Sequence, residues 1–505
     1  METKKISRAL ISVFYKDGLL PVVTELAEHG VEFYSTGGTY NFISDAGFAC
    51  KKVEDLTGYP SILSGRVKTL HPKVFGGILA RRNEENDIKQ LTEYEIPELD
   101  LVIVDLYPFS ETVKSDASAD DIIEKIDIGG ISLIRAAAKN FNDVCVISNR
   151  SQYKQLVEIL KRNKGATTIE ERRKFASSAF VNTSDYDTEI SSWFKGHSQL
   201  LNIKINGAEQ LRYGENPHQL GTYYGQMNDI FEKLHGKEIS YNNLLDIDAA
   251  VGLISEFDDA TVAVIKHNNA CGIASHPNIV EAWKRALAGD PISAYGGVIV
   301  LNRPVEENLA SEINNLFFEV LIAPEFSPIA LETLFTKKNR MILRLKRYPK
   351  RQKLYRTVLE GILEQDPDNS VADAMSAKFI TTLKPEDNEL DDLLFGEKVV
   401  KHTRSNAIVL VKDKQLLAGI GGQTSRVDAL KQAIMKAEVF GFSLKGAIMA
   451  SDAFFPFSDS VEIAHKAGIT AVIQPGGSVR DNESIDYCNN NGIKMIFTGI
   501  RHFRH

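Results

Sequence analysis

Residues 262–274 combine an apolar run with several side chains that can do chemistry. Lys266, His267 and Cys271 lie within six residues of one another. A cysteine thiolate can act as a nucleophile, and a histidine can bind a metal ion or accept a proton. The β-branched run before Lys266 is typical of a buried strand, so the polar cluster is expected at the end of that strand.

Three roles are open to this cluster. As a nucleophile, Cys271 needs a neighbouring base and a lowered pKa, whereas a cysteine before a glycine is more often a small buried apolar residue. A zinc site needs further ligands, and the H-x-E and P-C-x-x-C pattern of zinc deaminases is absent from the sequence. The third interpretation pairs a cation, Lys266, with a titratable base, His267. Because neighbouring strand residues point to opposite faces, both can serve one site only where the strand ends.

A second candidate group lies near the N-terminus. The segment 34–40 follows a predicted strand and opens a predicted helix, and its hydroxyl and N–H groups can hold a phosphate there. A tight turn with a capping threonine would give the same pattern. The loop at 65–79 adds basic side chains, which would equally suit a charged surface. The residues concerned are Ser12, Lys16, Ser35, Thr36, Gly37, Gly38, Thr39, Arg66, Lys68, Thr69 and His71.

The composition is typical of a soluble globular enzyme. The chain has 505 residues, of which 43% are hydrophobic and 25% charged, and its net charge of −8 argues against binding to nucleic acid or to an anionic membrane. No apolar stretch approaches the ~20 residues of a transmembrane helix, and the N-terminus lacks a signal-peptide pattern. Four cysteines without a CxxC pair suit a reducing cytoplasm.

The segment 337–353 stands apart, with nine basic residues and no acidic ones. Alone, it could form a patch for nucleic acid. Many of its positions are apolar or neutral, and an acidic segment follows. We therefore interpret it as a solvated, strand-like face.

Strand-like and helical patterns alternate over roughly the first 195 residues, which predicts a parallel sheet with crossover helices. A charged helical region at about 151–195 closes this block. We predict two domains, residues 1–197 and 198–505, and expect the second to form two subdomains because it is large for one core. Two strand-then-glycine units in it, VAVIKHNNACG and AIVLVKDKQLLAGIGG, echo one another too weakly to establish a repeat.

Motifs along the whole chain carry a resemblance to a known family. SVFYKDG, STGGT, GRVKTLHPK, DLYPF and EKIDIGGISLIRAAAKN in the first block, and LRYGENPHQ, EISYNNLLDIDAA, VIKHNNACG, DPISAYGGVI, GGQTSRVDA and SDAFFPFSDSVE in the second, resemble the bifunctional AICAR formyltransferase/IMP cyclohydrolases of purine biosynthesis. The resemblance implies an α/β protein. Its N-terminal domain would be methylglyoxal-synthase-like, with a Rossmann-like parallel sheet, and its C-terminal domain would be cytidine-deaminase-like, in two subdomains without the deaminase zinc.

For the first domain, the resemblance implies closure of formyl-AICAR to IMP with loss of water. This reaction needs two groups held close together, a stabilised oxyanion and proton transfer. Lys68 and Tyr107 match the family's catalytic positions, and Asp127 and Lys139 match supporting polar ones. The residues that fall where the family binds the nucleotide are Ser12, Lys16, Ser35, Thr36, Gly37, Gly38, Thr39, Arg66 and Thr69.

For the second domain, the resemblance implies formyl transfer from 10-formyltetrahydrofolate to the 5-amino group of AICAR, without a metal. His267 matches the base, Lys266 the stabiliser of the intermediate and Asn406 a third catalytic position. Folate-binding positions are matched by Asp452, Phe454, Phe455 and Pro456. AICAR-binding positions are matched by Arg212, Tyr213, Asn243, Gly297, Glu319, Arg426 and Arg501.

The family also implies a cytoplasmic homodimer with transformylase sites shared between subunits. Two departures from the family's pattern stand out, one beside the catalytic pair and one at an AICAR-binding position. The segment KHNNACG carries asparagine and alanine where many relatives have threonine or serine and proline, and Glu319 stands where some have aspartate. An enzyme with only the cyclohydrolase activity remains the alternative.

Overall fold

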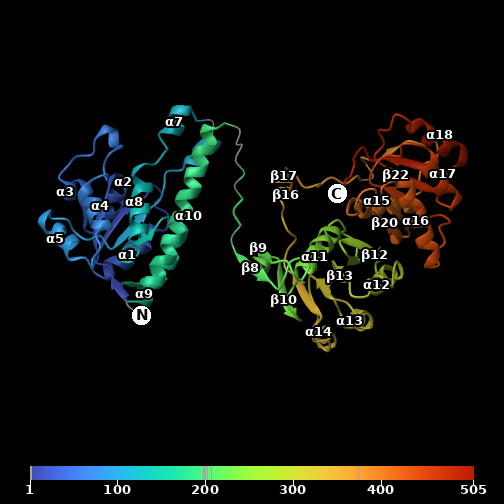
Figure 1. The fold of residues 1–505 in the computed structure, drawn as a ribbon, viewed down its shortest axis with the longest axis horizontal. Coiled ribbons are helices and arrows are strands. Elements are labelled where there is room, and N and C mark those ends of the chain that lie inside the picture. Colours follow the sequence, from blue (N-terminus) through green and yellow to red (C-terminus); the bar gives the residue numbers. More distant parts are fainter. Residues whose placement is uncertain (1–2, 116, 197–200, 202, 206, 374) are drawn as a thin grey trace. The chain divides into compact units, whose positions relative to one another are not determined.

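The computed structural model describes residues 3–115, 117–196, 201, 203–205, 207–373 and 375–505. The chain divides into two compact units, residues 1–203 and 204–505 (Figure 1). No helix among the described residues is long and apolar enough to cross a membrane.

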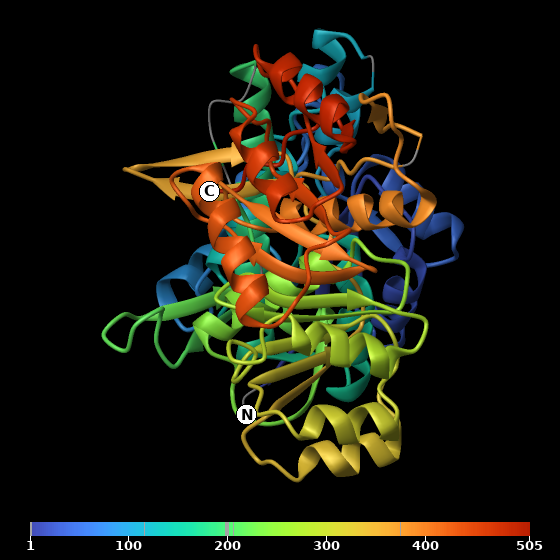
Figure 2. The same cartoon turned by 90° about the vertical axis from the view of Figure 1, so that its right-hand side faces the viewer.

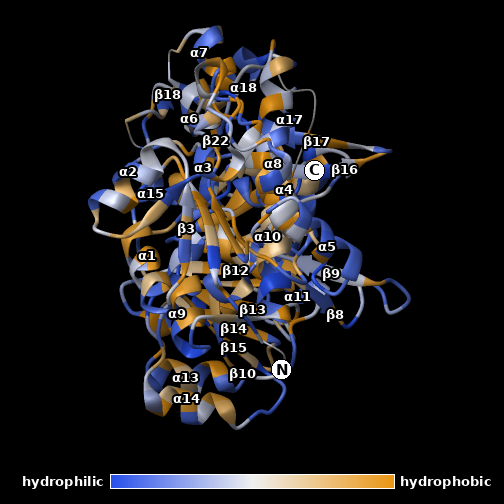
Figure 3. Cartoon of the chain, turned by 90° about the vertical axis from the view of Figure 1, so that its left-hand side faces the viewer, coloured by the Kyte–Doolittle hydropathy of each residue, from blue (hydrophilic) through white to orange (hydrophobic). Residues whose placement is uncertain are grey.

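Unit 1 is built on a five-stranded sheet in the order β4-β3-β2-β5-β6, and every pair in it is parallel. Its short strands are rich in buried β-branched residues, as expected where helices cover both faces. The central strands are mostly coloured as hydrophobic in Figure 3. The strands are β2 (Arg8–Ser12), β3 (Glu32–Ser35), β4 (Cys50–Lys52), β5 (Leu101–Val104) and β6 (Cys145–Ile147).

The strand order reverses direction between β2 and β5, because the chain first builds β3 and β4 on one side of β2 and then β5 and β6 on the other. In open parallel sheets, ligands bind at the carboxyl ends of the strands beside such a switch point. The helices of this unit are α1 (Leu19–Glu28), α2 (Gly37–Asp45), α3 (Val53–Thr57), α4 (Pro72–Leu79), α5 (Glu85–Glu93), α6 (Phe109–Lys114), α7 (Ala119–Ile123), α8 (Gly129–Lys139), α9 (Tyr153–Arg162) and α10 (Ile169–Phe194).

The region at 151–195 forms two helices rather than one. The short strand β7 (Ala166–Thr168) separates α9 from α10 and pairs with β1 (Thr3–Lys5). Thr168 then caps α10, since its hydroxyl accepts the N–H of Glu171 and the Glu171 carboxylate accepts the N–H of Thr168. The continuous helical pattern hid this interruption.

Unit 2 contains a twelve-stranded sheet in the order β10-β15-β14-β13-β11-β12-β20-β19-β21-β22-β23-β18, whose strands run from green to red in Figure 2. The strands of its first half are β10 (Phe231–His235), β11 (Thr261–Lys266), β12 (Asn269–Ser275), β13 (Val298–Leu301), β14 (Val320–Ala323) and β15 (Met341–Leu345). Those of its second half are β18 (Lys378–Phe379), β19 (Ile408–Lys412), β20 (Gln415–Ile420), β21 (Ile448–Ser451), β22 (Ala471–Gln474) and β23 (Lys494–Phe497).

The two halves of this sheet repeat one architecture. Outward from the β12–β20 junction, the order β12-β11-β13-β14-β15 is matched by β20-β19-β21-β22-β23, with the same parallel and antiparallel pairings. The helices recur in the same places along the chain. They are α11 (Tyr241–Ile254), α12 (Ile279–Ala288), α13 (Glu307–Asn314) and α14 (Pro328–Phe335), matched by α15 (Asp387–Lys401), α16 (Arg426–Val439), α17 (Asp459–Lys466) and α18 (Asp481–Asn491).

The cores of the two halves are arranged differently on the two faces of the sheet. On one face, α11 and α15 pack into a single cluster that draws on both halves, with Ile247 and Leu253 from the first and Leu393 and Val399 from the second. On the other face each half has its own cluster. The junction strands themselves share the single registered pair Ala274–Gln415.

The basic segment 337–353 contributes β15, which lies between β10 and β14 in the sheet. Arg344 on this strand forms ion pairs with Glu232 and with Glu325, and Arg351 pairs with Asp248. Two small antiparallel ribbons complete the unit, β8 (Ala208–Leu211) with β9 (Gly221–Tyr224), and β16 (Leu354–Val358) with β17 (Gly361–Gln365).

Candidate active sites

A cavity of about 840 Å³ lies in unit 1 at the carboxyl ends of β2 and β5, beside the N-termini of α2 and α8. This is the switch point of the sheet. It gathers most of the residues expected for the first reaction, namely Ser12, Lys16, Thr36, Gly37, Gly38, Thr39, Arg66, Lys68, Thr69, Tyr107 and Asp127.

The glycine-rich turn forms one wall of this cavity. Helix α2 begins at Gly37, whose φ of 43° lies in the left-handed region that favours glycine. The hydroxyls of Ser12 and Thr36 lie 2.9 Å apart, and the Thr39 hydroxyl donates to the carbonyl of Val13. The turn is thereby fixed to the end of β2, and the first residues of α2 line the cavity, where a helix N-terminus is suited to hold an anion.

Ser35 does not line the cavity. Its side chain is fully buried, and its hydroxyl donates to the carbonyl of Ile11 at 2.6 Å. It joins β3 to β2 beneath the turn. The sequence motif alone does not show that Ser35 lies outside the cavity. Side chains alternate between the two faces of a strand, and the motif does not tell which face the hydroxyl takes.

Two carboxylates and a phenol lie on the opposite side of the cavity. Asp127 accepts the N–H of Gly130 at 2.6 Å, and burial raises the pKa of its carboxyl. Burial, reinforced by the charge of Asp127, also raises the pKa of Tyr107, which leaves the phenol a proton donor at neutral pH. Asp105, which was not expected in the site, follows β5 directly and accepts the N–H of Tyr15 at 3.0 Å.

The cations of the cavity differ in their surroundings. Burial lowers the pKa of Lys16, an effect partly opposed by Asp105. Arg66 forms an exposed ion pair with Glu124 at the rim. Lys68 lies close to the glycine turn, since its Nζ would be 3.9 Å from a Cβ placed on Gly37. Lys68 therefore lies beside the glycine turn, in the cavity that Tyr107 also lines.

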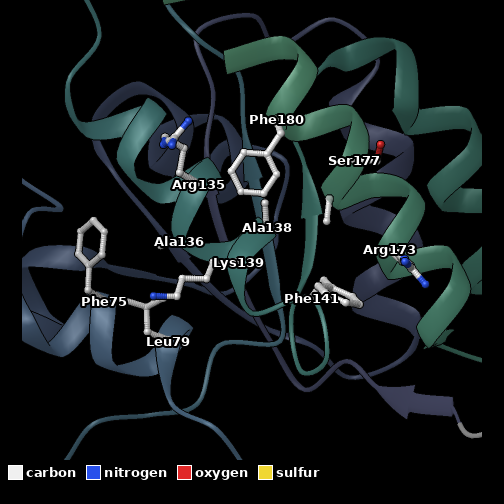
Figure 4. Close-up of a pocket in the computed structure, with 11 residues that line it drawn as sticks. Phe75, Leu79, Arg135, Ala136, Ala138, Lys139, Phe141, Arg173, Ser177 and Phe180 are labelled. Carbon is white, nitrogen blue, oxygen red and sulfur yellow. The ribbon is translucent and has the colours of Figure 1, made fainter. Parts of the chain in front are cut away.

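Lys139 lies elsewhere. It ends α8, an eleven-residue helix of which Gly129, Gly130 and Leu133 line the cavity, so about 9 Å of helix separates Lys139 from the last of these. It borders a second cavity of about 640 Å³, largely apolar, together with Arg135, Arg173 and Phe180 (Figure 4). The guanidinium of Arg135 lies over the ring of Phe180 there. The structure thus does not bring Lys139 to the first cavity within one chain.

In unit 2, the strand that leads to the lysine–histidine pair ends at Lys266, as its sequence predicts. β11 ends at Lys266 and β12 begins at Asn269, so His267 and Asn268 form a two-residue hairpin turn with φ of 49° and 63°. Lys266 is half-buried, and its Nζ donates to the carbonyl of Tyr295 at 2.7 Å. The exposed His267 projects from the turn.

Cys271 is a packing residue. Its side chain is buried, its Sγ donates to the carbonyl of Val264 at 3.3 Å, and burial raises the pKa of its thiol to about 12. A thiol held neutral in this way is a poor nucleophile. Among the described residues, no group of three His, Cys, Asp or Glu side chains is arranged to hold a metal ion.

Asn406 lies in the second half of the unit, at a corner built around a buried carboxylate. Its side-chain amide donates to the carbonyl of Gln423 at 3.0 Å. Asp452, fully buried, accepts from the Ser405 hydroxyl at 2.5 Å, from the Ala407 N–H at 3.1 Å and from Arg426 at 2.9 Å. Asp452 and Arg426 therefore shape the corner that presents Asn406, rather than facing open space.

A cavity of about 210 Å³ at the junction of the two halves lies between the hairpin and this corner. Asn269 and Ala270 line it from β12, and Gly421 and Gln423 line it from the segment after β20. Gln423 is the residue that holds Asn406. The junction of the halves therefore brings the hairpin next to the segment that fixes Asn406.

The other expected substrate and folate residues of unit 2 have varied surroundings. Asn243 is a buried capping residue whose Oδ1 accepts from the Ser240 hydroxyl, and Glu319 pairs with Lys237 at 2.5 Å. Phe455 is fully buried in the core of the second half, whereas Phe454 and Pro456 are exposed. Arg212 lies over Tyr213, and Arg501 over Phe503. The backbone at Gly297 lies close to that of Ile265, since a Cβ on this glycine would be 2.9 Å from the Ile265 carbonyl oxygen.

Comparison with known proteins gives one consistent result. The model of the AICARFT/IMPCHase bienzyme family matches residues 137–436, and that of the MGS-like domain matches residues 18–132. The chain is 58% identical over 505 residues to the bifunctional purine biosynthesis protein PurH of Bacteroides thetaiotaomicron, covering 100% of both chains. It is 46% identical over 518 residues to the protein of that name from Acetivibrio thermocellus, covering 99% of this chain and 100% of the relative. The family resemblance and the MGS-like N-terminal domain are thereby confirmed, and the chain belongs to the AICARFT/IMPCHase bienzyme family.

Proposed function

We propose that this chain catalyses two consecutive steps of purine biosynthesis, one in each unit. Unit 2 transfers the formyl group of 10-formyltetrahydrofolate to AICAR, and unit 1 closes the product to IMP with loss of water. The observation that carries the proposal is the cavity at the switch point of unit 1, where a glycine-rich anion turn meets Lys68, Tyr107 and Asp127. Relatives named as bifunctional along the full length of the chain support it.

In unit 1, the N-terminus of α2 and the cations Lys16 and Arg66 bind the phosphate of the nucleotide. The carboxamide nitrogen then attacks the formyl carbon of the same molecule, so the main requirement is a fixed near-attack geometry. Lys68 and Tyr107 stabilise the oxyanion and transfer protons as water departs, and Asp127 supports them.

In unit 2, the 5-amino group of AICAR is a weak nucleophile because its lone pair is delocalised. His267 accepts the amine proton as the nitrogen attacks the formyl carbon, and tetrahydrofolate leaves with the proton on its nitrogen. Lys266 keeps two N–H donors free of its bond to Tyr295 and directs them at the developing oxyanion. Asn406 likewise retains one amide N–H besides the one bound to Gln423.

We further propose a cytoplasmic homodimer, a cytidine-deaminase-like fold for each half of unit 2, and recognition of the folate by Phe454 and Pro456. Phe454 and Pro456 are both exposed. Lys139 lies about 9 Å along α8 from the last residue of that helix that lines the cavity, and we propose that its supporting role depends on a second subunit.

Separate loss of the two activities tests this proposal. AICAR and 10-formyltetrahydrofolate are supplied, and tetrahydrofolate and IMP are both followed. His267→Ala should abolish tetrahydrofolate formation but still cyclise added formyl-AICAR, and Lys68→Ala should do the reverse. His276→Ala, at a half-buried histidine before α12 that has no expected catalytic role, is the control.

The alternative, a chain with cyclohydrolase activity alone, predicts no tetrahydrofolate from the unaltered protein. Loss of both activities in either folded variant would contradict the assignment of one reaction to each unit.

A further inference from the structure

The two halves of unit 2 contain equivalent hairpin turns, of which one carries the expected chemistry and the other does not. In the first half, Lys266 pairs with Asn269 across the turn His267–Asn268. In the second, Lys412 pairs with Gln415 across the turn Asp413–Lys414. All four turn residues have positive φ, between 49° and 63°. Each hairpin also carries a register shift at the same place, after Val264 and after Leu410.

The lysine before each turn is held in the same way. Lys266 donates to the carbonyl of Tyr295 at 2.7 Å, and Lys412 donates to the carbonyl of Lys445 at 2.8 Å. Each acceptor lies three residues before the next strand, β13 or β21. The lysine and its carbonyl partner are therefore features of the repeated architecture, and the residue that distinguishes the first turn is His267.

Each turn is also held by one carboxylate from the preceding helix. Asp246 of α11 accepts the N–H of Asn268 at 2.7 Å and is hydrogen-bonded by the backbone of His267. Asp392 of α15 accepts the N–H groups of Asp413 and Lys414 at 2.8 and 2.6 Å. Asp246 and Asp392 are both the sixth residue of their helices.

A carboxylate in this position has a clear physical task. Residues other than glycine and asparagine rarely adopt positive φ, and His267 and Asn268 do so consecutively. A charged acceptor for their N–H groups offsets the strain and fixes the direction in which the imidazole leaves the turn. Burial raises the pKa of Asp246, and the bonded N–H groups, with the neighbouring side chains of His267 and Lys266, partly oppose this rise.

We propose that Asp246 is a positioning residue for formyl transfer, acting through the backbone of His267 to hold the base in its productive orientation. This inference rests on the proposed function, in which His267 is the base of unit 2. The observed contacts of Asp246 are with the backbone of the turn, which is why the role is one of positioning. Asp392 performs the same structural task at a turn without catalytic residues, so the protein contains a matched control.

The test compares Asp246→Asn with Asp392→Asn. Each change removes one charge and one acceptor from an equivalent turn. Asp246→Asn should lower kcat for formyl transfer by about 10- to 100-fold, because small misplacements of a catalytic group have effects of this size. The Kd for AICAR should change less than about threefold, since the residues that match AICAR-binding positions are untouched. Asp392→Asn should leave kcat within about threefold, and both variants should retain cyclohydrolase activity.

A double variant distinguishes positioning from general damage. In a His267→Ala background, Asp246→Asn should lower the residual rate by less than about twofold, because its effect passes through a side chain already removed. Asp246→Glu keeps the negative charge on a side chain that is one methylene longer, and its kcat should be intermediate. It replaces Asp246→Asn in the test if that variant does not fold. Equal losses of kcat in the Asp246 and Asp392 variants would overturn the inference, as would an undiminished effect of Asp246→Asn without His267. Failure of the proposed function gives a different result, a His267→Ala variant with unchanged formyl transfer.

Discussion

Replacement of His502 by leucine should destabilise unit 2 in a pH-dependent way. The buried imidazole of His502 lies between two carboxylates, with Nδ1 at 2.7 Å from Asp368 and Nε2 at 3.4 Å from Glu397. Burial alone would lower the pKa of His502, but the hydrogen bonds and charges of Glu397 and Asp368 raise it overall. The imidazolium therefore links the C-terminal segment to α15 and to the segment before β18.

The magnitude follows from what the substitution leaves behind. Glu397 is 2% exposed and, among the residues that the structure describes, would keep only the N–H of Ala372 as a partner. Removal of one partner from a buried ion pair costs about 3–5 kcal/mol. The side chain of Asp368 is 45% exposed and adds little. At about 2 °C per kcal/mol for a unit of this size, the unfolding midpoint of unit 2 should fall by roughly 6–10 °C near pH 6.

The pH dependence has a definite sign. A histidine whose folded pKa is raised contributes stability that is fully present below its unfolded pKa, about 6.5, and lost as pH rises through the folded pKa. Calorimetry of wild type and His502→Leu from pH 6 to pH 9 should therefore show midpoints that converge with rising pH. His218→Leu, at an exposed histidine, is the control. A difference that is absent at pH 6, or that is constant over this range, would refute the reasoning.

Three further changes test other parts of unit 2. Gly272→Ala places a Cβ 1.8 Å from the carbonyl oxygen of Ala286 and should lower the free energy of unfolding, measured by denaturant titration, by more than about 3 kcal/mol. The control Gly361→Ala, whose Cβ meets an ordinary contact, should lower it by less than about 1 kcal/mol. Cys271→Ala should retain formyl transfer within about threefold, and the native thiol, with its pKa near 12, should resist alkylation at pH 8; rapid modification would contradict its burial. Burial alone would raise the pKa of Glu256, but His402 and Lys401 lower it to about 2. Glu256 therefore stabilises the fold above about pH 4.3 and loses this contribution as pH falls toward 2. Glu256→Gln should flatten the acid-unfolding profile of unit 2 between these pH values, and an unchanged profile would exclude the ion pair as the source of that pH dependence.

The sequence predicted features that depend on local pattern. The β-branched run before Lys266 and the polar residues after it predicted the end of β11 at that residue, and the glycine-rich segment predicted the turn that opens α2. The buried state of Cys271 followed from its type and neighbours. These properties are set by residues within a few positions of each other, so they are visible in a single sequence.

Features that depend on distant contacts were not predictable in this way. Lys139 lies in the same helix as residues that line the cavity, but the rise of that helix carries it away. Asp246 precedes the turn that it holds by more than twenty residues, and nothing in its helix distinguishes it from Asp248. The sequence similarity between the two hairpins was too weak to show that they are equivalent, because the two backbones carry different side chains at the turn.

The core shared by α11 and α15 has a consequence for how unit 2 folds. In solenoid proteins each repeat contacts only its neighbours, so stability is a sum over repeats and partial unfolding is common. Here either half alone would expose one side of a cluster that includes Ile247, Leu253, Leu393 and Val399. The registered pairing between the halves is too short to replace that burial. Duplication has thus produced two copies of a topology but one cooperative folding unit, in which neither copy is a domain by itself.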